Sequence, residues 1–374
     1  MKISLPRDAP SAGITVVVPC YRYGHFLHRV VGSILEQPDV SARVIIVDDA
    51  SPDESAEVAR AIAREDSRVS VIVHRQNLGH IATYNDGLAL VETEFVSLVS
   101  ADDLVAPGAL GRATRLMSTY PRVGLVYGGV VDFVDDDVPI GEHRWGRETW
   151  SVWSGRNWWR GVMRRGKNPI LSPEVVMRTS TLRDVGAYSS ALPHSGDLEY
   201  WLRAAAVGDI GRVNGRAQAY YRVHGNNMHL RHFNATAEDL RQRALAFAAV
   251  AGGELPDGFD GFEGGHLATR ALAREAIRDA CRRLDRGATT DEVRPLVEFA
   301  REHMSEIEAE WIARAVTARI RRSDAGLKPA RLQQAVEFGY SQKDRIRFKV
   351  RNVLGIGNVS NPNEPGSTIE TADA

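Results

Sequence analysis

Two short hydrophobic segments of this chain each lead into a pair of adjacent aspartates, and this feature constrains the fold most. The run Phe95–Val99 is closely followed by Asp102 and Asp103, and a second run ends in Asp48 and Asp49. A buried, unpaired carboxylate is costly, so each pair should mark a strand end at the rim of a sheet. Ligands of open α/β sheets bind outside the carboxyl ends of the strands. The two pairs therefore predict a cation and nucleotide site at one sheet edge.

The aspartates after the second run also have a structural explanation. Ser51 followed by Pro52 is typical of a helix start, with Ser51 as the N-cap, and Asp48-Asp49 can belong to the turn that caps this helix. The same explanation is weaker for Asp102-Asp103, although Pro107 also predicts a helix start nearby. Two acidic strand ends on one sheet edge favour the ligand site.

Strand-like and helix-like segments alternate through the first third of the chain. The expected strands cover residues 13–20, 43–49, 69–74, 95–99 and 123–127, and the expected helices cover 24–36, 51–64, 79–91 and 107–120. Short connections between alternating strands and helices predict an α/β fold with a mostly parallel sheet that is covered on both faces.

The pattern is less regular from residue 140 to 195, where five of the seven tryptophans lie between Trp145 and Trp159. Core packing is the default for such a cluster, and stacking on a sugar ring is the alternative. Strands are expected over 174–178 and 218–223, with a short helix over 181–185. Apolar residues at helical spacing from Leu198 to Ala205 place Asp197 in the first turn of a further helix.

The C-terminal third, residues 235–356, is rich in Ala, Arg, Glu and Leu and predicts a helical region that can support oligomerisation. Its helices are expected over 236–251, 265–286, 290–304 and 305–322, with a break at 252–265. The basic stretch 319–351 fits either peripheral contact with an anionic membrane or a solvated helix face. Residues 357–374 are polar and predict a disordered tail, and residues 1–12 an N-terminal tail.

Composition narrows the class of protein. The 374 residues carry a formal net charge of -1, which gives no reason to expect a nucleic-acid partner. Two cysteines, Cys20 and Cys281, lie far apart in sequence and argue against a disulfide framework, so a cytoplasmic compartment is expected. No apolar h-region opens the sequence, and no apolar run approaches the roughly 20 residues that span a bilayer.

Six short motifs follow one another in an order that resembles the family 2 glycosyltransferases. They are Val18-Pro-Cys-Tyr21, Val47-Asp-Asp-Ala-Ser51, Asn77-Leu-Gly79 with Asn85-Asp-Gly87, Ser100-Ala-Asp-Asp103, Gly196-Asp-Leu-Glu-Tyr-Trp-Leu-Arg203 and Tyr221-Arg-Val-His-Gly-Asn-Asn227. Members of this family are inverting enzymes of the GT-A fold. The resemblance covers about residues 13–232 and implies a domain over 13–234, with a donor-nucleotide half (13–130) and an acceptor half (131–234).

The resemblance implies roles on the donor side of the site. Pro19, Cys20, Tyr21, Asp49 and Asn85 stand where the family binds the donor nucleotide, with Asp49 accepting a hydrogen bond from the base. The donor is expected to be a UDP-, GDP- or dTDP-linked sugar.

The resemblance also implies a metal and a general base. Asp102 and Asp103 lie in the family's DxD region, where Asp102 contacts the donor and both bind Mn²⁺ or Mg²⁺ together with His224. Arg222 is expected to contact the diphosphate, and Asp197 is the expected general base. The metal would stabilise charge on the departing diphosphate, and the base would take the proton of the acceptor hydroxyl.

Glu199 and Trp201 are expected on the acceptor side. The family resemblance implies a sugar, a lipid-linked acceptor or another hydroxyl acceptor, in bacterial surface polysaccharide, glycolipid or glycoconjugate synthesis. Such an enzyme would work in the cytoplasm or on the inner face of the plasma membrane.

Two departures from the family pattern keep an alternative open. Ser100 replaces the usual first Asp of the DxD region, and Tyr84 replaces a frequent Arg. A non-catalytic sugar-nucleotide-binding or scaffold protein on the same fold would carry such changes, although it would not need Asp197. A nucleotidyltransferase is a weaker alternative, because Pro19-Cys-Tyr-Arg is not a Gly-rich phosphate loop.

Overall fold

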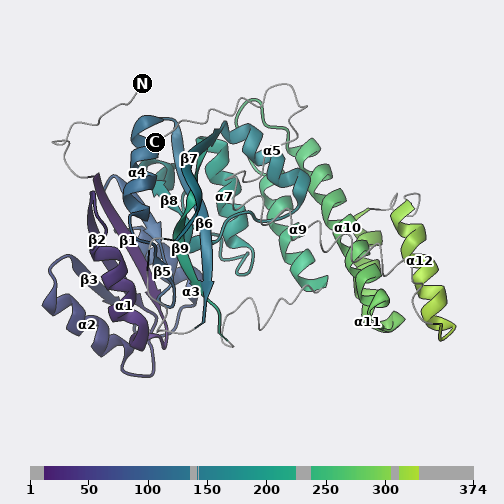
Figure 1. The fold of residues 1–374 in the computed structure, drawn as a ribbon, viewed down its shortest axis with the longest axis horizontal. Coiled ribbons are helices and arrows are strands. Elements are labelled where there is room, and N and C mark those ends of the chain that lie inside the picture. Colours follow the sequence, from purple (N-terminus) through teal and green to yellow (C-terminus); the bar gives the residue numbers. More distant parts are fainter. Residues whose placement is uncertain (1–11, 135–140, 142, 225–236, 305–310, 328–374) are drawn as a thin grey trace.

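The computed structural model describes residues 12–134, 141, 143–224, 237–304 and 311–327, and shows one twisted sheet with helices on both faces and a helical C-terminal extension (Figure 1). The strands are β1 (Ala12–Cys20), β2 (Val40–Asp48), β3 (Val69–Val73), β4 (Phe95–Leu98), β5 (Leu104–Val105), β6 (Val123–Phe133), β7 (Arg144–Trp153), β8 (Val176–Arg178) and β9 (Asp209–Arg222). The helices are α1 (Gly24–Leu35), α2 (Ser55–Glu65), α3 (His80–Leu88), α4 (Ala109–Thr119), α5 (Gly155–Arg165), α6 (Thr179–Val185), α7 (Gly196–Val207), α9 (Ala237–Ala251), α10 (Gly261–Asp285), α11 (Thr290–His303) and α12 (Trp311–Asp324), with a 3-10 turn η1 (Ser172–Glu174).

The first half of the sheet is parallel, in the order β3-β2-β1-β4. Successive residues of β1 face opposite sides: Val16 and Val18 belong to the core under α1, α2 and α4, whereas Val17 belongs to the core under α3 and α7. Cys20 pairs with Asp48, so β1 and β2 end at the same level of the sheet. The α/β fold and the shared rim of strand ends are therefore confirmed.

The second half of the sheet is mixed. Strand β8 runs antiparallel to both β4 and β6, β6 and β9 are parallel, and β5 and β7 are antiparallel to β9. Strand β7 and helix α5 were not expected, because the tryptophans of residues 145–159 show no clear period in the sequence. Strands β6 and β9 are also longer than the runs 123–127 and 218–223 that predicted them.

Two predicted helix boundaries are wrong. Helix α2 begins at Ser55 and not at Ser51, whose hydroxyl donates to Asp48 Oδ2 at 2.6 Å. Helix α10 begins at Gly261, inside the predicted break, after an Asp260 side chain that accepts from the Glu263 N–H at 2.8 Å. A side chain in place of Gly264 would meet the Trp159 ring at 2.2 Å, so this glycine reflects close helix packing and not a break.

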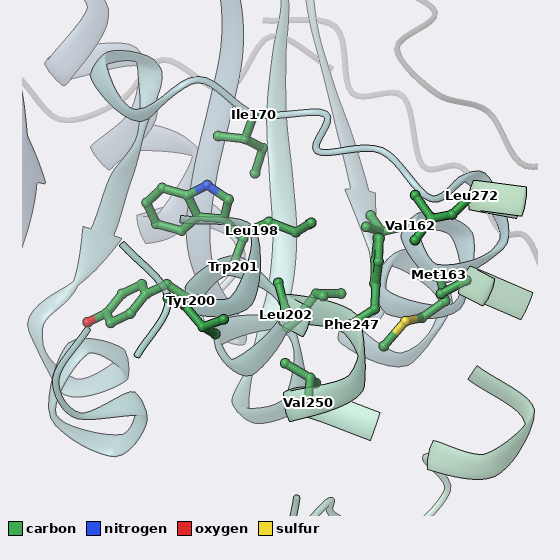
Figure 2. Packing of buried hydrophobic residues seen from close by; sticks show 14 of the residues in the cluster. Val162, Met163, Ile170, Leu198, Tyr200, Trp201, Leu202, Phe247, Val250 and Leu272 are labelled. Atoms are coloured by element: carbon green, nitrogen blue, oxygen red, sulfur yellow. The ribbon is translucent and has the colours of Figure 1, made fainter. Parts of the chain in front are cut away.

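The C-terminal helices share one continuous core with the helices on one face of the sheet. Figure 2 shows this core where Phe247 and Val250 of α9 and Leu272 of α10 pack against residues of α5 and α7. The labelled partners from α5 and α7 are Val162, Met163, Leu198, Tyr200, Trp201 and Leu202. The helical region is thus built onto the α/β domain. The tails 1–11 and 357–374 and most of the basic stretch 319–351 lie outside the described residues.

Candidate active site

The turn after β4 is tied to the end of β9. The N–H of Asp103 donates to the Ser100 carbonyl at 3.0 Å, and the N–H of Arg222 donates to Asp103 Oδ1 at 3.0 Å. Asp103 is 2% exposed, and burial together with the charge of Asp102 raises its pKa well above the usual range. Asp103 therefore joins two strands of the sheet at the rim of the site.

Asp102 and His224 come together at this rim. His224 Nε2 lies 3.0 Å from Asp102 Oδ2, and the imidazole meets the Tyr23 ring edge-on at 5.7 Å between centroids. A carboxylate oxygen and an imidazole nitrogen are ligand atoms that suit Mn²⁺, so these two side chains fit a divalent cation. Among the described residues, no three or more His, Cys, Asp or Glu side chains are grouped closely enough to hold a metal.

The Arg222 guanidinium is buried between two aromatic rings. Its Cζ lies 4.1 Å from the centroid of Phe26 and 4.4 Å from that of Phe133, and its Nε donates to the Asp102 carbonyl at 2.9 Å. The residue is 3% exposed. Stacking on both rings and the bond to the Asp102 backbone hold the guanidinium inside the fold, and the expected contact with the diphosphate stays a prediction.

Asp49, at the end of β2, holds the loop before α3. Its oxygens accept the N–H groups of Leu78 and Gly79 at 2.8 and 2.9 Å, and Asp49 Oδ1 lies 2.8 Å from His74 Nδ1. Burial opposes ionisation, but these hydrogen bonds and the His74 interaction outweigh it and lower the pKa of Asp49. Asp49 is a buried anion that shapes the rim, and its contact with a base stays a prediction.

The ends of β1 and β2 adopt strained backbone conformations. Arg22 and Ala50 have φ angles of 63° and 55°, and the N–H of Arg22 donates to Ser51 Oγ at 2.9 Å, which joins the two turns. Left-handed conformations at non-glycine residues cost about 1–3 kcal/mol and cluster at functional sites. Between the strand β1 and this strained turn, Tyr21 is 42% exposed and faces solvent.

The other predicted nucleotide contacts near β1 and α3 are mostly inside the protein. Cys20 is 2% exposed, and burial raises the pKa of its thiol to about 12. Pro19 is a partly buried residue of β1, paired with Val47. Asn85 donates to the Tyr188 carbonyl at 3.0 Å and accepts the Tyr188 N–H at 2.8 Å. Because both ends of its amide are engaged, Asn85 joins α3 to the chain before α7, and its expected contact with the donor nucleotide stays a prediction.

Asp197 lies in the first turn of α7, as predicted. Its Oδ1 accepts from the Leu198 N–H at 2.7 Å, and its Oδ2 accepts from Asn168 Nδ2 at 2.9 Å. The N-terminus of a helix favours a negative charge. Asn168 escaped prediction, because its contact with Asp197 spans 29 residues and depends on tertiary structure.

Glu199 and Trp201 stabilise helix α7. Glu199 is 7% exposed and forms two hydrogen bonds with the Arg203 guanidinium, at 2.6 and 2.9 Å. Trp201 is 2% exposed and packs in the core seen in Figure 2. Both side chains are buried in the fold, and their expected contacts with the acceptor stay predictions. Four members of the tryptophan cluster are also buried in the core: Trp150, Trp153, Trp158 and Trp159.

Tyr84 connects the two sides of the site electrostatically. Burial, followed by the negative charges of Asp197, Asp102 and Asp103, raises the pKa of its hydroxyl. The three carboxylates therefore act on one side chain, although two follow β4 and the third lies on α7. Tyr84 also meets Tyr188 edge-on, with 5.7 Å between ring centroids.

Comparison with known proteins finds glycosyltransferases among the similar sequences and structures. Residues 15–183 match the family model described as glycosyl transferase family 2. An uncharacterised glycosyltransferase of Haemophilus influenzae is 20% identical over 240 residues, which are 63% of this chain and 73% of that protein. Glycosyltransferase GlyG of Streptococcus pneumoniae is 39% identical over 93 residues, 25% of this chain and 31% of that protein.

Two further relatives, one of them a solved structure, extend the comparison. The succinoglycan biosynthesis protein ExoU of Rhizobium meliloti is 31% identical over 104 residues, 28% of this chain and 30% of that protein. The chain thus spans about a third of the length of GlyG and ExoU. The crystal structure of S. aureus TarS 1-349 with UDP-GlcNAc has a TM-score of 0.60 at 17% identity, over 84% of this chain and 92% of that one, which shows a shared fold.

Proposed function

We propose that this chain, whose residues 15–183 match the model of glycosyl transferase family 2, transfers a sugar from a nucleoside diphosphate to an acceptor hydroxyl with inversion. Asp197 is the general base of this proposal, and Asp102 is on the donor side. The observations that support it are the place of Asp197 in the first turn of α7, where Leu198 N–H and Asn168 bind its carboxylate, and the pair of Asp102 and His224 at the rim of the sheet. An inverting displacement needs a carboxylate base for the acceptor and groups that hold the donor, and these residues are the candidates for the two roles.

Donor binding is assigned to the rim of the sheet. Asp102 and His224 would hold Mn²⁺ or Mg²⁺, which when bound neutralises charge on the departing diphosphate. Asp103 and Arg222 hold the turn that presents Asp102. Tyr21, exposed at the end of β1, offers an aromatic face for the base. The TarS structure contains UDP-GlcNAc, so UDP-sugars are the first donors to test, followed by GDP- and dTDP-sugars.

Proton transfer is assigned to the N-terminus of α7. Asp197, ionised at the positive end of the helix dipole, accepts the proton of the acceptor hydroxyl as the new glycosidic bond forms. The oxygen attacks the anomeric carbon from the face opposite to the departing diphosphate, and this inverts the configuration. A relative named for succinoglycan biosynthesis makes a growing polysaccharide or a lipid-linked sugar the acceptor class to test first.

Asp197→Asn tests the assignment. Transfer should fall by about 10²–10⁴-fold because the base is lost, whereas UDP binding in the presence of Mn²⁺ should stay close to wild type. Asp184→Asn, an exposed change on α6, is the matched control and should keep full activity. Full turnover by the Asp197 variant would refute the base assignment. If the wild-type protein binds a nucleotide sugar but shows no turnover with any acceptor tested, the non-catalytic alternative is favoured.

A further inference from the structure

We infer that Asn168 is a positioning residue for transfer: its side-chain amide fixes the Asp197 carboxylate in the orientation from which it accepts the acceptor's proton. The inference rests on the proposed role of Asp197 as the base. It also gives the C-terminal helices a part in the site, because they hold the segment that carries Asn168.

The orientation of the Asn168 amide is fixed at both ends. Asn168 Nδ2 donates to Asp197 Oδ2 at 2.9 Å, and Asn168 Oδ1 accepts the N–H of Ile170 at 3.1 Å. Ile170 is 1% exposed and is anchored in the core (Figure 2). The amide therefore cannot flip without losing the hydrogen bond to Ile170, and its NH₂ group stays directed at the carboxylate.

Asp197 is held from a second direction by its own helix. The Leu198 N–H donates to Asp197 Oδ1 at 2.7 Å, so the two carboxylate oxygens receive hydrogen bonds from different parts of the chain. These two bonds oppose rotation of the carboxylate plane. Asn168 is a neutral donor, so it can orient the carboxylate without pairing it with a cation.

Helices α9 and α10 hold the segment 166–168. Arg243 of α9 donates to the Gly166 carbonyl at 2.6 Å and to Glu275 of α10 at 3.2 Å. Lys167 Nζ lies 3.2 Å from Glu275. A Cβ on Gly166 would meet Ala271 of α10 at 3.0 Å, so the backbone lies close against that helix.

A continuous set of contacts thus leads from the C-terminal helices to the candidate base. Glu275 and Arg243 fix the segment 166–168, and Asn168 in turn fixes Asp197. An error of about 1 Å in the place of a catalytic group can cost about 100-fold in rate. The C-terminal helices would therefore affect kcat without touching the substrate.

The test compares Asn168→Ala and Asn168→Asp in the full chain, with UDP-sugar turnover and UDP binding as readouts. Asn168→Ala removes the NH₂ group that donates a hydrogen bond to Asp197. Asn168→Asp keeps the shape of the side chain and an oxygen that accepts the Ile170 N–H. Its carboxyl group repels Asp197 when it is ionised, and donates its own proton to Asp197 in a hydrogen bond when it is protonated. We expect kcat to fall by about 10- to 100-fold in both, with the donor KM and the melting temperature within experimental error of wild type.

Controls separate this inference from the proposed function. Asn157→Ala, at an exposed position of α5, should leave kcat unchanged. Wild-type kcat in both Asn168 variants, alongside an inactive Asp197→Asn protein, would overturn the role of Asn168 and leave the proposed function standing. A donor KM that rises in step with the fall in kcat would also overturn it, because general disruption of the site would then explain the loss. Full activity of Asp197→Asn would remove the proposed function itself.

Discussion

His224 Nε2 lies 3.0 Å from Asp102 Oδ2, and this contact joins the turn after β4 to the residues that follow β9. We expect His224→Ala to weaken the Mn²⁺-dependent part of UDP binding by about 10- to 100-fold, because one of the two proposed metal ligands is lost. Calorimetric titration with UDP, with and without Mn²⁺, measures this difference.

His266→Ala is the control for the loss of a histidine, since His266 is exposed on α10 beside Phe262. This variant should bind UDP and Mn²⁺ as the wild type does. Binding of UDP by the His224 variant with an unchanged dependence on Mn²⁺ would show that His224 does not serve the metal.

The Arg222 guanidinium should contribute to stability more than to phosphate binding. Arg222→Lys removes the planar group that stacks between Phe26 and Phe133, and it removes the Nε–H donated to the Asp102 carbonyl. We expect the free energy of unfolding to fall by about 1–3 kcal/mol. Urea denaturation measures this loss, and Arg60→Lys on the exposed face of α2 is the control.

The opposite result would restore the role that the sequence motif predicts. If Arg222→Lys leaves the free energy of unfolding unchanged while UDP binding is lost, the guanidinium must move out to the diphosphate when the donor binds. Its burial in the structure would then describe only the protein without donor.

Glu275 should make the C-terminal helices sensitive to acid. Burial opposes its ionisation, but Arg243 and Lys167 outweigh this and lower the pKa of Glu275 below the usual 4.5. A carboxyl whose pKa is lower in the folded protein stabilises the fold above its unfolded pKa, and this stabilisation is lost as the pH falls through the folded value. The loss should therefore occur below about pH 5, and Glu275→Gln should abolish this part of the pH dependence.

Urea denaturation at pH 7 and pH 4 measures the effect. At pH 7 the Glu275→Gln protein should be about 1–3 kcal/mol less stable than wild type, and at pH 4 the two should differ less. Glu298→Gln, at an exposed position of α11, should show no such convergence. A constant difference between the Glu275 variant and wild type at both pH values would contradict the ion-pair explanation.

The predictions from sequence succeeded where a local pattern determines the structure. Alternating β-branched runs and amphipathic segments set the order of β1 to β4 and their helices, and the helical spacing after Asp197 placed it in the first turn of α7. They failed where distant parts of the chain decide. Nothing near Arg222 indicates that Phe26 and Phe133, which both lie far from it in the sequence, will enclose its guanidinium.

The same distinction applies to polar groups and to glycines. Asn168 contacts Asp197 only because α5 and α7 pack together, and a single asparagine before a proline carries no local sign of this. Gly264 looked like part of a loop because glycine is rare in helix interiors, and only the Trp159 ring packed against α10 explains it. Motif order predicted the candidate site, but only the structure shows which of its residues are exposed and which are buried.

Gly87 provides a last test, because it sits where α3 packs directly on the sheet. A Cβ at this position would lie 2.4 Å from Val17 Cγ1 and 2.9 Å from Val47 Cγ2, so Gly87→Ala must push α3 away from β1 and β2. We expect a loss of about 1–3 kcal/mol in the free energy of unfolding, and weaker UDP binding as Asn85 and Tyr84 move with the helix. Gly32→Ala in α1 is the matched control, since its Cβ would meet only Glu36 Oε1 at 4.0 Å, and alanine should there stabilise by up to about 1 kcal/mol. Similar unfolding free energies for the two variants would mean that α3 can shift without cost, and the close packing of Gly87 would then not explain its place in the motif.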